Sequence, residues 1–315
     1  MTKVIFMGTP PFAVNILAGL LAQNYEIMAV VTQPDKAVGR KHKLQASPVK
    51  VYAEEHGLKV YQPAKLSGSP ELQGLIKLQP DLIITAAFGQ FLPTSLLKAA
   101  RLAALNVHGS LLPRNRGGAP IQRAIMNGDQ ETGVTIMYMA AQMDAGDIIS
   151  QVATPISATD TAGDLFARLS DLGRDLLLET LPQVLAGTNS RQEQVADLVT
   201  ITPNLSPEEE VIQVQNSALQ INRQVRGLNP EPGAYFSLLG SRVKVFATKV
   251  GDQTTTKEPG QVVVRTKNEL AIAVGQQTVL YLEQLQPAGK KIMPVQAFLN
   301  GQGREIQVGD QIIDQ

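Results

Sequence analysis

The chain has 315 residues, 43% of them hydrophobic and 18% charged, which is enough for two globular domains that each bury a core. Lys and Arg total 28, as do Asp and Glu, so overall charge gives no attraction to a polyanion. The absence of cysteine excludes disulfides, thiolate nucleophiles and Cys-based zinc sites.

The first half of the chain alternates two kinds of pattern. Short apolar runs ending in turn signals read "KVIFMG", "EIMAVVTQ", "DLIITAAFG" and "ALNVHGS". Helical patterns lie between them and read "FAVNILAGLLAQ", "SPVKVYAEEHG", "SPELQGLIKLQ" and "PTSLLKAA". This alternation predicts an α/β fold with a doubly wound, mostly parallel, Rossmann-like sheet covered by helices on both faces.

Further elements complete a first domain, which we place at residues 1–189. Two strand patterns, "GVTIMYMA" and "DIISQVATPI", surround the turn "QMDAGD". An amphipathic helix begins near Thr161, with Asp160 or Thr161 as its cap. Its apolar face is marked by leucines at spacings of three and four: Leu165, Leu169, Leu172 and Leu176.

The pattern then weakens into a polar stretch, and we predict a linker at residues 190–207. A second domain, 208–315, starts with the helix candidate "EEEVIQVQNSALQINRQVRGL". Six short strands follow, separated by Gly and Pro: "GAYFSLLG", "RVKVFATKV", "GQVVVRTKN", "ELAIAVG", "QTVLYLEQL" and "REIQVGD". This spacing indicates a small barrel or sandwich. Of the two, we predict an OB-like β-barrel.

Several catalytic and nucleotide-binding motifs are missing. The first turn, "GTPPFA", has Pro where the dinucleotide fingerprint needs Gly, which argues against a dehydrogenase. The chain has no "GKS" or "GKT" for nucleotide phosphates and no "GxSxG" elbow. The three histidines are too scattered for a zinc motif, so we expect no metal. The start "MTKVIFMGTPPFA" lacks signal-peptide features and no apolar run fits a membrane span, so we expect a cytoplasmic protein.

The end of the strand "ALNVH" presents two polar side chains. Asn106 and His108 are two residues apart and point to the same side, at the carboxyl edge where open α/β sheets bind ligands. A carboxamide can donate to an oxyanion, and an imidazole can move a proton near neutral pH. The alternative is a histidine that only packs. Asp144, in the turn "MDAGD", is either a turn residue or a carboxylate that orients the ring.

The stretch "NVHGSLLPRNRGGAPIQRAIMNGD", together with "GVTIMYM" and "MDAGD", strongly resembles the formyltransferases that use 10-formyltetrahydrofolate. The resemblance implies that Asn106, His108 and Asp144 are the catalytic trio, which stabilises a tetrahedral intermediate and moves a proton. It also implies that one loop and the end of the preceding strand contact the folate, through Ser110, Leu111, Leu112, Pro113, Phe88 and Gly89.

Other motifs are similar to those of the subfamily that formylates methionyl initiator tRNA for translation initiation. They are "FMGTPPFAV", "VVTQPDKAVGRKHKL", "SPVK", "NPEPGAYF" and "LQPAGKKIM". Residues 36–50 carry several basic residues and no acid, which fits either a phosphate-binding surface or a solvated loop. The resemblance implies that tRNA is held by the C-terminal barrel and by this loop, through Lys36, Arg40, Lys41 and Lys43.

The chain departs from the family pattern at Asn115, Asn204 and Glu231, where an aromatic residue, Lys and Trp are frequent, and at "IQV" (212–214), which replaces an "IDW"-like stretch. None of them belongs to the trio. Two other functions stay open: a formyltransferase for a small amine, such as an amino sugar or a glycinamide ribonucleotide, and a non-catalytic RNA-binding protein on the same fold. We expect a monomer that does not associate with membranes.

Overall fold

The computed structural model describes residues 1–38 and 43–313 and divides into two compact units. The first unit is made of Met1–Pro120, Glu131–Pro155 and Phe166–Pro203. The second is made of Ile121–Gln130, Ile156–Leu165 and Asn204–Gln315. Most of the segment that the sequence predicts to be a linker, 190–207, therefore lies within the first unit.

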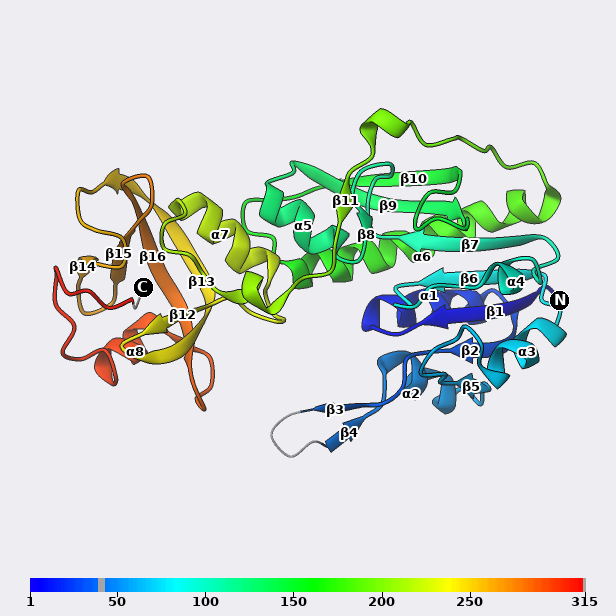
Figure 1. Ribbon diagram of the computed structural model, residues 1–315, viewed down its shortest axis with the longest axis horizontal. Coiled ribbons are helices and arrows are strands. Elements are labelled where there is room, and N and C mark those ends of the chain that lie inside the picture. The colour runs from blue at the N-terminus through cyan, green and yellow to red at the C-terminus, as the bar shows by residue number, and fades with distance from the viewer. Residues whose placement is uncertain (39–42, 314–315) are drawn as a thin grey trace. The chain divides into compact units, whose positions relative to one another are not determined.

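The first unit is built on a seven-stranded sheet in the order β10-β9-β7-β6-β1-β2-β5 (Figure 1). Its strands are β1 (Lys3–Gly8), β2 (Glu26–Val31), β5 (Val60–Tyr61), β6 (Leu82–Ala86), β7 (Ala103–His108), β9 (Glu131–Tyr138) and β10 (Ile148–Pro155). The strands from β7 to β5 are parallel, whereas β9 and β10 run antiparallel to their neighbours. The predicted mostly parallel sheet is confirmed.

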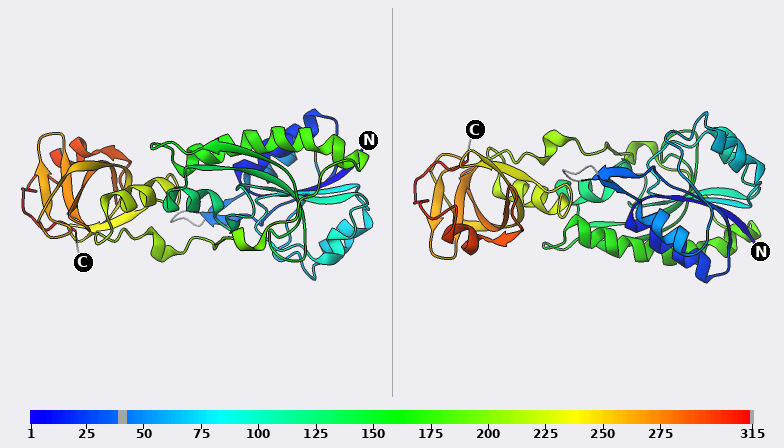
Figure 2. Two further views of the ribbon diagram at one scale, coloured as in Figure 1. Left: turned by 90° about the horizontal axis from the view of Figure 1, so that it is seen from above. Right: turned by 90° about the horizontal axis from the view of Figure 1, so that it is seen from below.

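Helices cover both faces of this sheet (Figure 2). They are α1 (Pro11–Ala22), α2 (Pro48–Glu55), α3 (Pro70–Lys77), α4 (Thr94–Leu97) and α6 (Ala162–Ala186). On one face α6 lies against α1, where the Ser170 hydroxyl donates to the Phe12 carbonyl at 2.9 Å. On the other face, side chains of α3 and α4 such as Leu75 and Leu96 pack in one core cluster with Ile83 of β6. The strand order and this coverage set which residues reach the carboxyl edge.

Local sequence signals explain where several of these helices begin. The Ser47 and Ser69 hydroxyls cap α2 and α3, and Pro follows each of them at the first helical position. The Thr161 hydroxyl accepts from the Asp164 amide at 3.2 Å, and the Asp164 carboxylate accepts from the Thr161 amide at 2.9 Å. This reciprocal capping box starts α6 at the residue that the sequence predicts.

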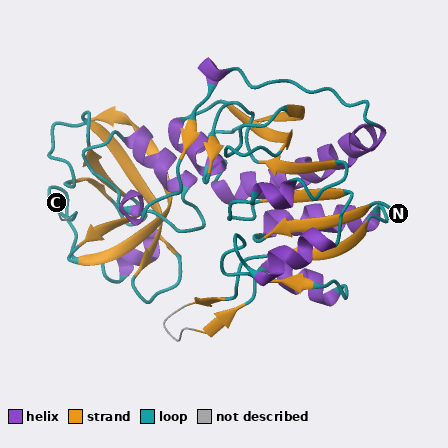
Figure 3. Cartoon of the chain, turned by 45° about the vertical axis from the view of Figure 1, so that its right-hand side comes forward, coloured by secondary structure: helices purple, strands orange, loops and turns teal. Residues whose placement is uncertain are grey.

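The second unit contains an antiparallel sheet, seen as the group of orange strands near the C label in Figure 3. Its strand order is β12-β13-β16-β15-β14, with β17 paired to β16. Its strands are β12 (Tyr235–Leu238), β13 (Ser241–Thr254), β14 (Val262–Arg265), β15 (Leu270–Val274), β16 (Thr278–Pro287) and β17 (Met293–Pro294). The helices of this unit are α5 (Pro120–Asn127), α7 (Ala218–Gly227) and α8 (Val295–Asn300).

The C-terminal segment joins the two edges of this sheet. Gln311 forms a bridge with Gln261, beside β14, and Ile313 forms a bridge with Leu238 of β12. Main-chain hydrogen bonds from Leu239 to the Ile312 carbonyl (2.9 Å) and from Val262 to the Asp310 carbonyl (2.9 Å) reinforce the closure. Because both edges are paired, the sheet closes as a barrel and leaves few unsatisfied strand edges.

Two local predictions for this unit are wrong. The helix expected over "EEEVIQVQNSALQINRQVRGL" is a short 3₁₀ turn at Pro207–Glu210 followed by a helix only from Ala218. Ile212 donates its amide to the Tyr235 carbonyl at 2.8 Å, so this stretch pairs with the sheet before Ser217 caps α7. The strand expected at "REIQVGD" is absent from the described residues, because Arg304 and Ile306 form turns with Gly301 and Gly303.

Within residues 1–38 and 43–313, no helix combines the length and apolarity that a bilayer crossing requires.

The barrel closure generates a test of stability. Ile312 is 1% exposed in the barrel core, so Ile312→Ala should lower the unfolding free energy of the second unit by about 2–5 kcal/mol. Native-state amide exchange in β13 to β16 measures that free energy locally. Val308→Ala, at a side chain that is 56% exposed, is the control and should change it by less than about 0.5 kcal/mol. Equal effects of the two changes would contradict the closure.

Candidate active site

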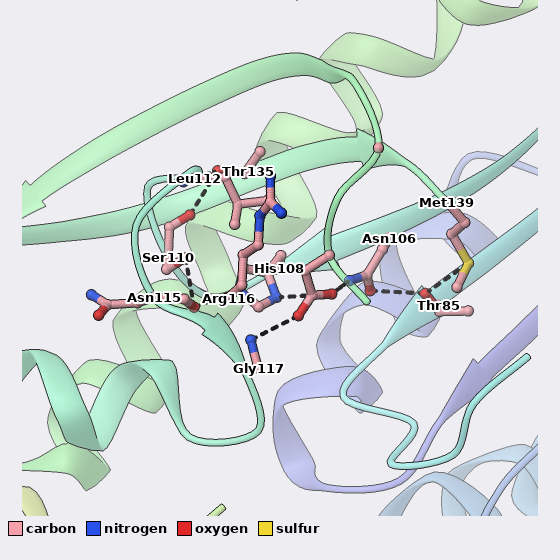
Figure 4. A network of polar contacts seen from close by, with 12 residues as sticks. Thr85, Asn106, His108, Ser110, Leu112, Asn115, Arg116, Gly117, Thr135 and Met139 are labelled. Carbon is pink, nitrogen blue, oxygen red and sulfur yellow. Dashed lines mark hydrogen bonds and ion pairs between the residues drawn. The ribbon is translucent and has the colours of Figure 1, made fainter. Parts of the chain in front are cut away.

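The end of β7 places two of the predicted site residues on the same side of the sheet. Asn106 lies opposite Thr85 of β6, and His108 lies opposite Thr135 of β9. The Thr85 hydroxyl donates to the Asn106 carboxamide oxygen at 2.8 Å (Figure 4). This hydrogen bond fixes the orientation of the amide, so the Asn106 NH₂ group is the end left to face the site.

His108 is 6% exposed, and its two ring nitrogens have different partners. Nε2 lies 3.0 Å from the Asn115 carbonyl oxygen, which can only accept, so Nε2 carries a proton (Figure 4). Nδ1 lies 3.7 Å from Oδ1 of Asp144. With Nε2 committed to the carbonyl, Nδ1 is the nitrogen that can gain or release a proton within the site.

Asp144 completes the group, and its two carboxylate oxygens have different roles. Oδ1 lies 3.4 Å from the Asn106 Nδ2 atom and also faces His108, so the two donors converge on one oxygen. Oδ2 accepts from the Gly117 amide at 2.9 Å. The structure thus brings together Asn106, His108 and Asp144, and it shows that Gly117 holds the carboxylate in place.

The backbone of this region is unusual at two positions. Asp144 has φ = 50°, a left-handed conformation that is uncommon for a residue with a side chain. Gly117 has φ = 121°, and a Cβ at this position would run into the Thr202 carbonyl oxygen. Only glycine suits Gly117, so the turn that presents its amide to Asp144 depends on this residue type.

The loop after His108 is braced from within. The Ser110 hydroxyl donates to the Arg114 carbonyl at 2.8 Å, and the Thr135 hydroxyl donates to the Ser110 carbonyl at 2.7 Å. Leu112 packs in a small buried cluster with Met137 of β9 and Ile148 of β10. The side chains of Ser110 and Leu112 therefore stabilise the loop itself.

A ligand beside this loop would meet main-chain groups and half-buried side chains. Of the predicted folate contacts in the loop, Leu111 and Pro113 are half-buried and Leu112 is buried. Phe88 is also buried, in the core beneath α3 and α4, and its carbonyl accepts from Thr9 and Gln33 side chains. Gly89 is exposed, with φ = 81°. The folate-contact role of these residues stays a prediction, and Phe88 is positioned to serve it only through its main chain.

Three supporting residues escape the sequence prediction: Thr85, Gly117 and Gln194. Thr85 could have been found from sheet register, since it lies opposite Asn106. Gln194 donates to the Asp144 carbonyl at 2.8 Å and to the Gly146 carbonyl at 2.7 Å. Nothing in the local sequence around Gln194 indicates these partners, because the bonds span 50 and 48 positions.

The basic segment is partly described. Lys36 and Lys43 are exposed on a two-stranded hairpin of β3 (Lys36–Val38) and β4 (Lys43–Gln45) that the sequence did not predict. The predicted tRNA contacts Arg40 and Lys41 lie outside the described residues. At the base of the hairpin, Asp35 accepts from the Lys50 Nζ at 2.8 Å.

No metal site is evident in the parts of the chain that the structure describes, since no three His, Asp or Glu side chains there are grouped to hold an ion. The site is instead an amide, an imidazole and a carboxylate at the carboxyl edge of a doubly wound sheet. Such a set can donate hydrogen bonds to a developing oxyanion and relay a proton. With an attached barrel, it defines a two-domain α/β protein suited to group transfer.

Comparison with known families agrees with this class. Residues 2–181 match the family described as formyl transferase, and residues 204–303 match the family described as formyl transferase, C-terminal domain. The chain belongs to the formyl transferase family.

Curated relatives match over the whole chain. The methionyl-tRNA formyltransferase of Latilactobacillus sakei subsp. sakei is 53% identical over 315 residues, covering 100% of this chain and 99% of the relative. The methionyl-tRNA formyltransferase of Levilactobacillus brevis is 54% identical over 314 residues, covering 100% of both chains.

Solved structures share the fold at low identity. An N-formyltransferase from Helicobacter canadensis, solved with folinic acid and dTDP-3-aminofucose, has a TM-score of 0.69 and 20% identity, covering 91% of this chain and 100% of that one. HypX from Aquifex aeolicus, solved with tetrahydrofolic acid, has a TM-score of 0.66 and 17% identity, covering 98% of this chain and 48% of that one. These likenesses confirm the fold.

The Asp35 carboxylate at the base of the hairpin predicts how the stability of the fold depends on pH. Hydrogen bonds from Gln62 and Lys50 hold the pKa of Asp35 below its ordinary value of 3.8. A carboxylate with a lowered pKa in the folded state stabilises the fold above its ordinary pKa, and this stabilisation is lost as pH falls through the lowered value. Asp35→Asn should therefore lose stability relative to wild type at pH 6, with the difference shrinking below about pH 4.

Urea midpoints measured from about pH 6 to pH 3 check this. Asp197→Asn, at an exposed position in the same unit, is the matched control. A difference between wild type and Asp35→Asn that grew as pH fell would contradict the assignment.

Proposed function

We propose that this protein transfers the formyl group of 10-formyltetrahydrofolate to the α-amino group of methionyl initiator tRNA. The meeting of Asn106 and His108 donors on one oxygen of Asp144, in a chain of the formyl transferase family, carries the chemistry. The acceptor rests on the relatives of 53–54% identity that match over the full chain and are named methionyl-tRNA formyltransferase.

The chemistry follows from what these residues can do. The methionyl amine attacks the formyl carbon, a new C–N bond forms, and the carbonyl oxygen of the tetrahedral intermediate becomes negative. The Asn106 NH₂ group and the protonated Nδ1 of His108 donate to that oxygen. When the bond to N10 of the folate breaks, the amine has lost one proton and N10 has gained one, a transfer for which His108 Nδ1 is placed.

Asp144 serves this cycle through its charge and position. Its Oδ1 lies beside both donors, so the carboxylate stabilises an imidazolium at His108 and orients the ring. The Gly117 amide, bound to Oδ2, keeps the carboxylate from turning away. No metal is required for these steps.

An assay of the acceptor tests the proposal. Wild-type protein with 10-formyltetrahydrofolate should formylate methionyl initiator tRNA, and should act poorly on free methionine or on an amino sugar nucleotide. The sugar acceptor is included because the solved Helicobacter canadensis protein, which shares the fold, was crystallised with dTDP-3-aminofucose. We expect the protein to act in the cytoplasm. We also expect it to be a monomer, and size-exclusion chromatography with light scattering measures its oligomeric state.

Variants of the trio test the chemistry. His108→Ala should lower kcat by about 10²–10⁴-fold because general acid–base help is lost. Asn106→Ala should lower it by about 10²–10³-fold because one oxyanion donor is lost. Single-turnover transfer to methionyl-tRNA measures both.

The matched control for this series is His56→Ala, which removes an exposed imidazole at the end of α2. Its kcat should equal that of wild type. If His108→Ala kept kcat within about threefold of wild type, the catalytic role assigned to His108 would be wrong, because loss of a proton carrier should lower kcat much further.

Variants of the hairpin test the tRNA contact. In Lys36→Ala/Lys43→Ala, tRNA affinity should fall, and the slope of log affinity against log salt should flatten by about 0.7–0.9 for each phosphate that the protein no longer neutralises. Folate affinity should stay unchanged, because the change removes surface charge only. Filter binding over a range of KCl concentrations measures the slope.

Lys77→Ala/Lys98→Ala, which also removes two exposed lysines, at α3 and at the end of α4, serves as the charge-matched control. If the hairpin variant and this control had the same salt slope as wild type, the hairpin lysines would have no contact with tRNA phosphates.

A further inference from the structure

Residues 190–203 leave α6 and run past β10 to a short strand, β11 (Ile201–Thr202), as Figure 1 shows. The sequence predicts this segment as part of a linker, yet it bonds at both ends to the segments that build the active site. We propose that it is a strap that positions the catalytic carboxylate, with Gln194 as the positioning residue. This inference rests on the proposed function of the site.

The first end of the strap binds the start of β10, next to the Asp144 turn. Gln192 and Ile148 exchange two main-chain hydrogen bonds, at 2.8 and 2.9 Å. Arg191 forms an ion pair with Asp147 at 3.1 Å and stacks its guanidinium over the Tyr138 ring, 4.1 Å from the centroid. These contacts fix the strap to the chain immediately after the turn.

The other end binds the loop that carries the Gly117 amide. The main chains of β11 and β8 (Arg116–Gly117) pair in parallel, and the Gly118 amide donates to the Thr202 carbonyl at 2.8 Å. The Thr200 hydroxyl accepts from the Asn115 amide at 2.8 Å. Asn115 is also the residue whose carbonyl faces His108 Nε2, so this end supports the imidazole as well.

Gln194 lies between the two ends and joins both sides of the site. Its NH₂ group donates to the Asp144 and Gly146 carbonyls. These two hydrogen bonds hold the turn in which Asp144 has its left-handed conformation. Its carbonyl oxygen accepts from the Arg116 guanidinium at 2.8 and 3.0 Å. The Gln194 side chain thus links Asp144 to Arg116. Arg116 directly precedes Gly117, whose amide binds the Asp144 carboxylate.

The consequence is specific to Asp144. Without the Gln194 NH₂ group, two carbonyls of the turn lose their hydrogen-bond donor. The turn is then held less firmly, so the hydrogen bond from the Gly117 amide to Oδ2 of Asp144 is weakened. Because the side-chain hydrogen bonds of Gln194 go to Asp144, Gly146 and Arg116, the proposal places the loss in kcat rather than in KM. A shift of about 1 Å in a catalytic group can lower a rate by about 10²-fold, and a partial loss of position should cost about tenfold.

Amide exchange of Gly117 provides a test that needs no substrate. In Gln194→Ala, exchange of this amide, resolved by NMR, should accelerate by at least about tenfold, because its acceptor is no longer held. Glu193→Ala, which removes a side chain of the same length from the exposed neighbouring position, should leave the rate at the wild-type value. Unchanged Gly117 exchange in Gln194→Ala would overturn the proposal.

Kinetics then separate positioning from a general loss of structure. Gln194→Ala should lower kcat for formyl transfer about tenfold with KM values for folate and methionyl-tRNA within about twofold. Gln194→Glu keeps the acceptor for Arg116 but lacks the NH₂ donor, and it should show the same defect. Full activity of Gln194→Glu would overturn the role assigned to the NH₂ group.

A double-mutant cycle completes the test. If Gln194 acts through Asp144, adding Gln194→Ala to Asp144→Asn should not lower kcat further, whereas independent effects would multiply and would overturn the inference. Absence of transfer to methionyl-tRNA by wild-type protein would instead overturn the proposed function. The Gly117 exchange rates would still decide whether the strap holds the carboxylate.

Discussion

The carboxylate of Asp144 is the constraint on which the candidate site depends. Both donors, the Asn106 amide and the His108 imidazole, face its Oδ1, while the Gly117 amide binds Oδ2. A single displacement of this carboxylate would therefore alter both donors together. The residue adopts φ = 50°, and such a backbone conformation costs about 1–3 kcal/mol and persists only where its surroundings hold it. The hydrogen bonds on its carboxylate and its carbonyl supply that support.

The register of the sheet sets the rest of the geometry. Threonines on the two strands beside β7 orient what β7 presents: Thr85 holds the Asn106 amide, and Thr135 holds the loop after His108 through the Ser110 carbonyl and the Leu112 amide. Sites built on strands keep their geometry better than sites built on loops. Here the hydrogen-bonding pattern that stabilises the core also fixes two catalytic candidates, and only Asp144 comes from a turn.

What the sequence could predict depends on how local the cause is. The period of two along β7 predicts that Asn106 and His108 share a side, and the box formed by Thr161 and Asp164 predicts the start of α6. The Asn106–Asp144 contact spans 38 positions and needs the antiparallel return of β9, which no local pattern specifies. The expected helix from 208 fails for the same reason, because pairing of Ile212 with Tyr235 overrides its helical pattern.

The segment that the sequence predicts to be a linker shows most clearly why composition alone is insufficient. A solvated tether avoids the cost of ordering its backbone, which is about 1–2 kcal/mol per residue. Residues 190–203 are instead ordered as part of the first unit, by main-chain pairing at Gln192 and Thr202 and by side-chain bonds at Gln194. Gln and Thr suit a tether because they are polar, and they suit a strap because they can both donate and accept. The same residues therefore predict either structure, and only partners remote in the chain decide between them.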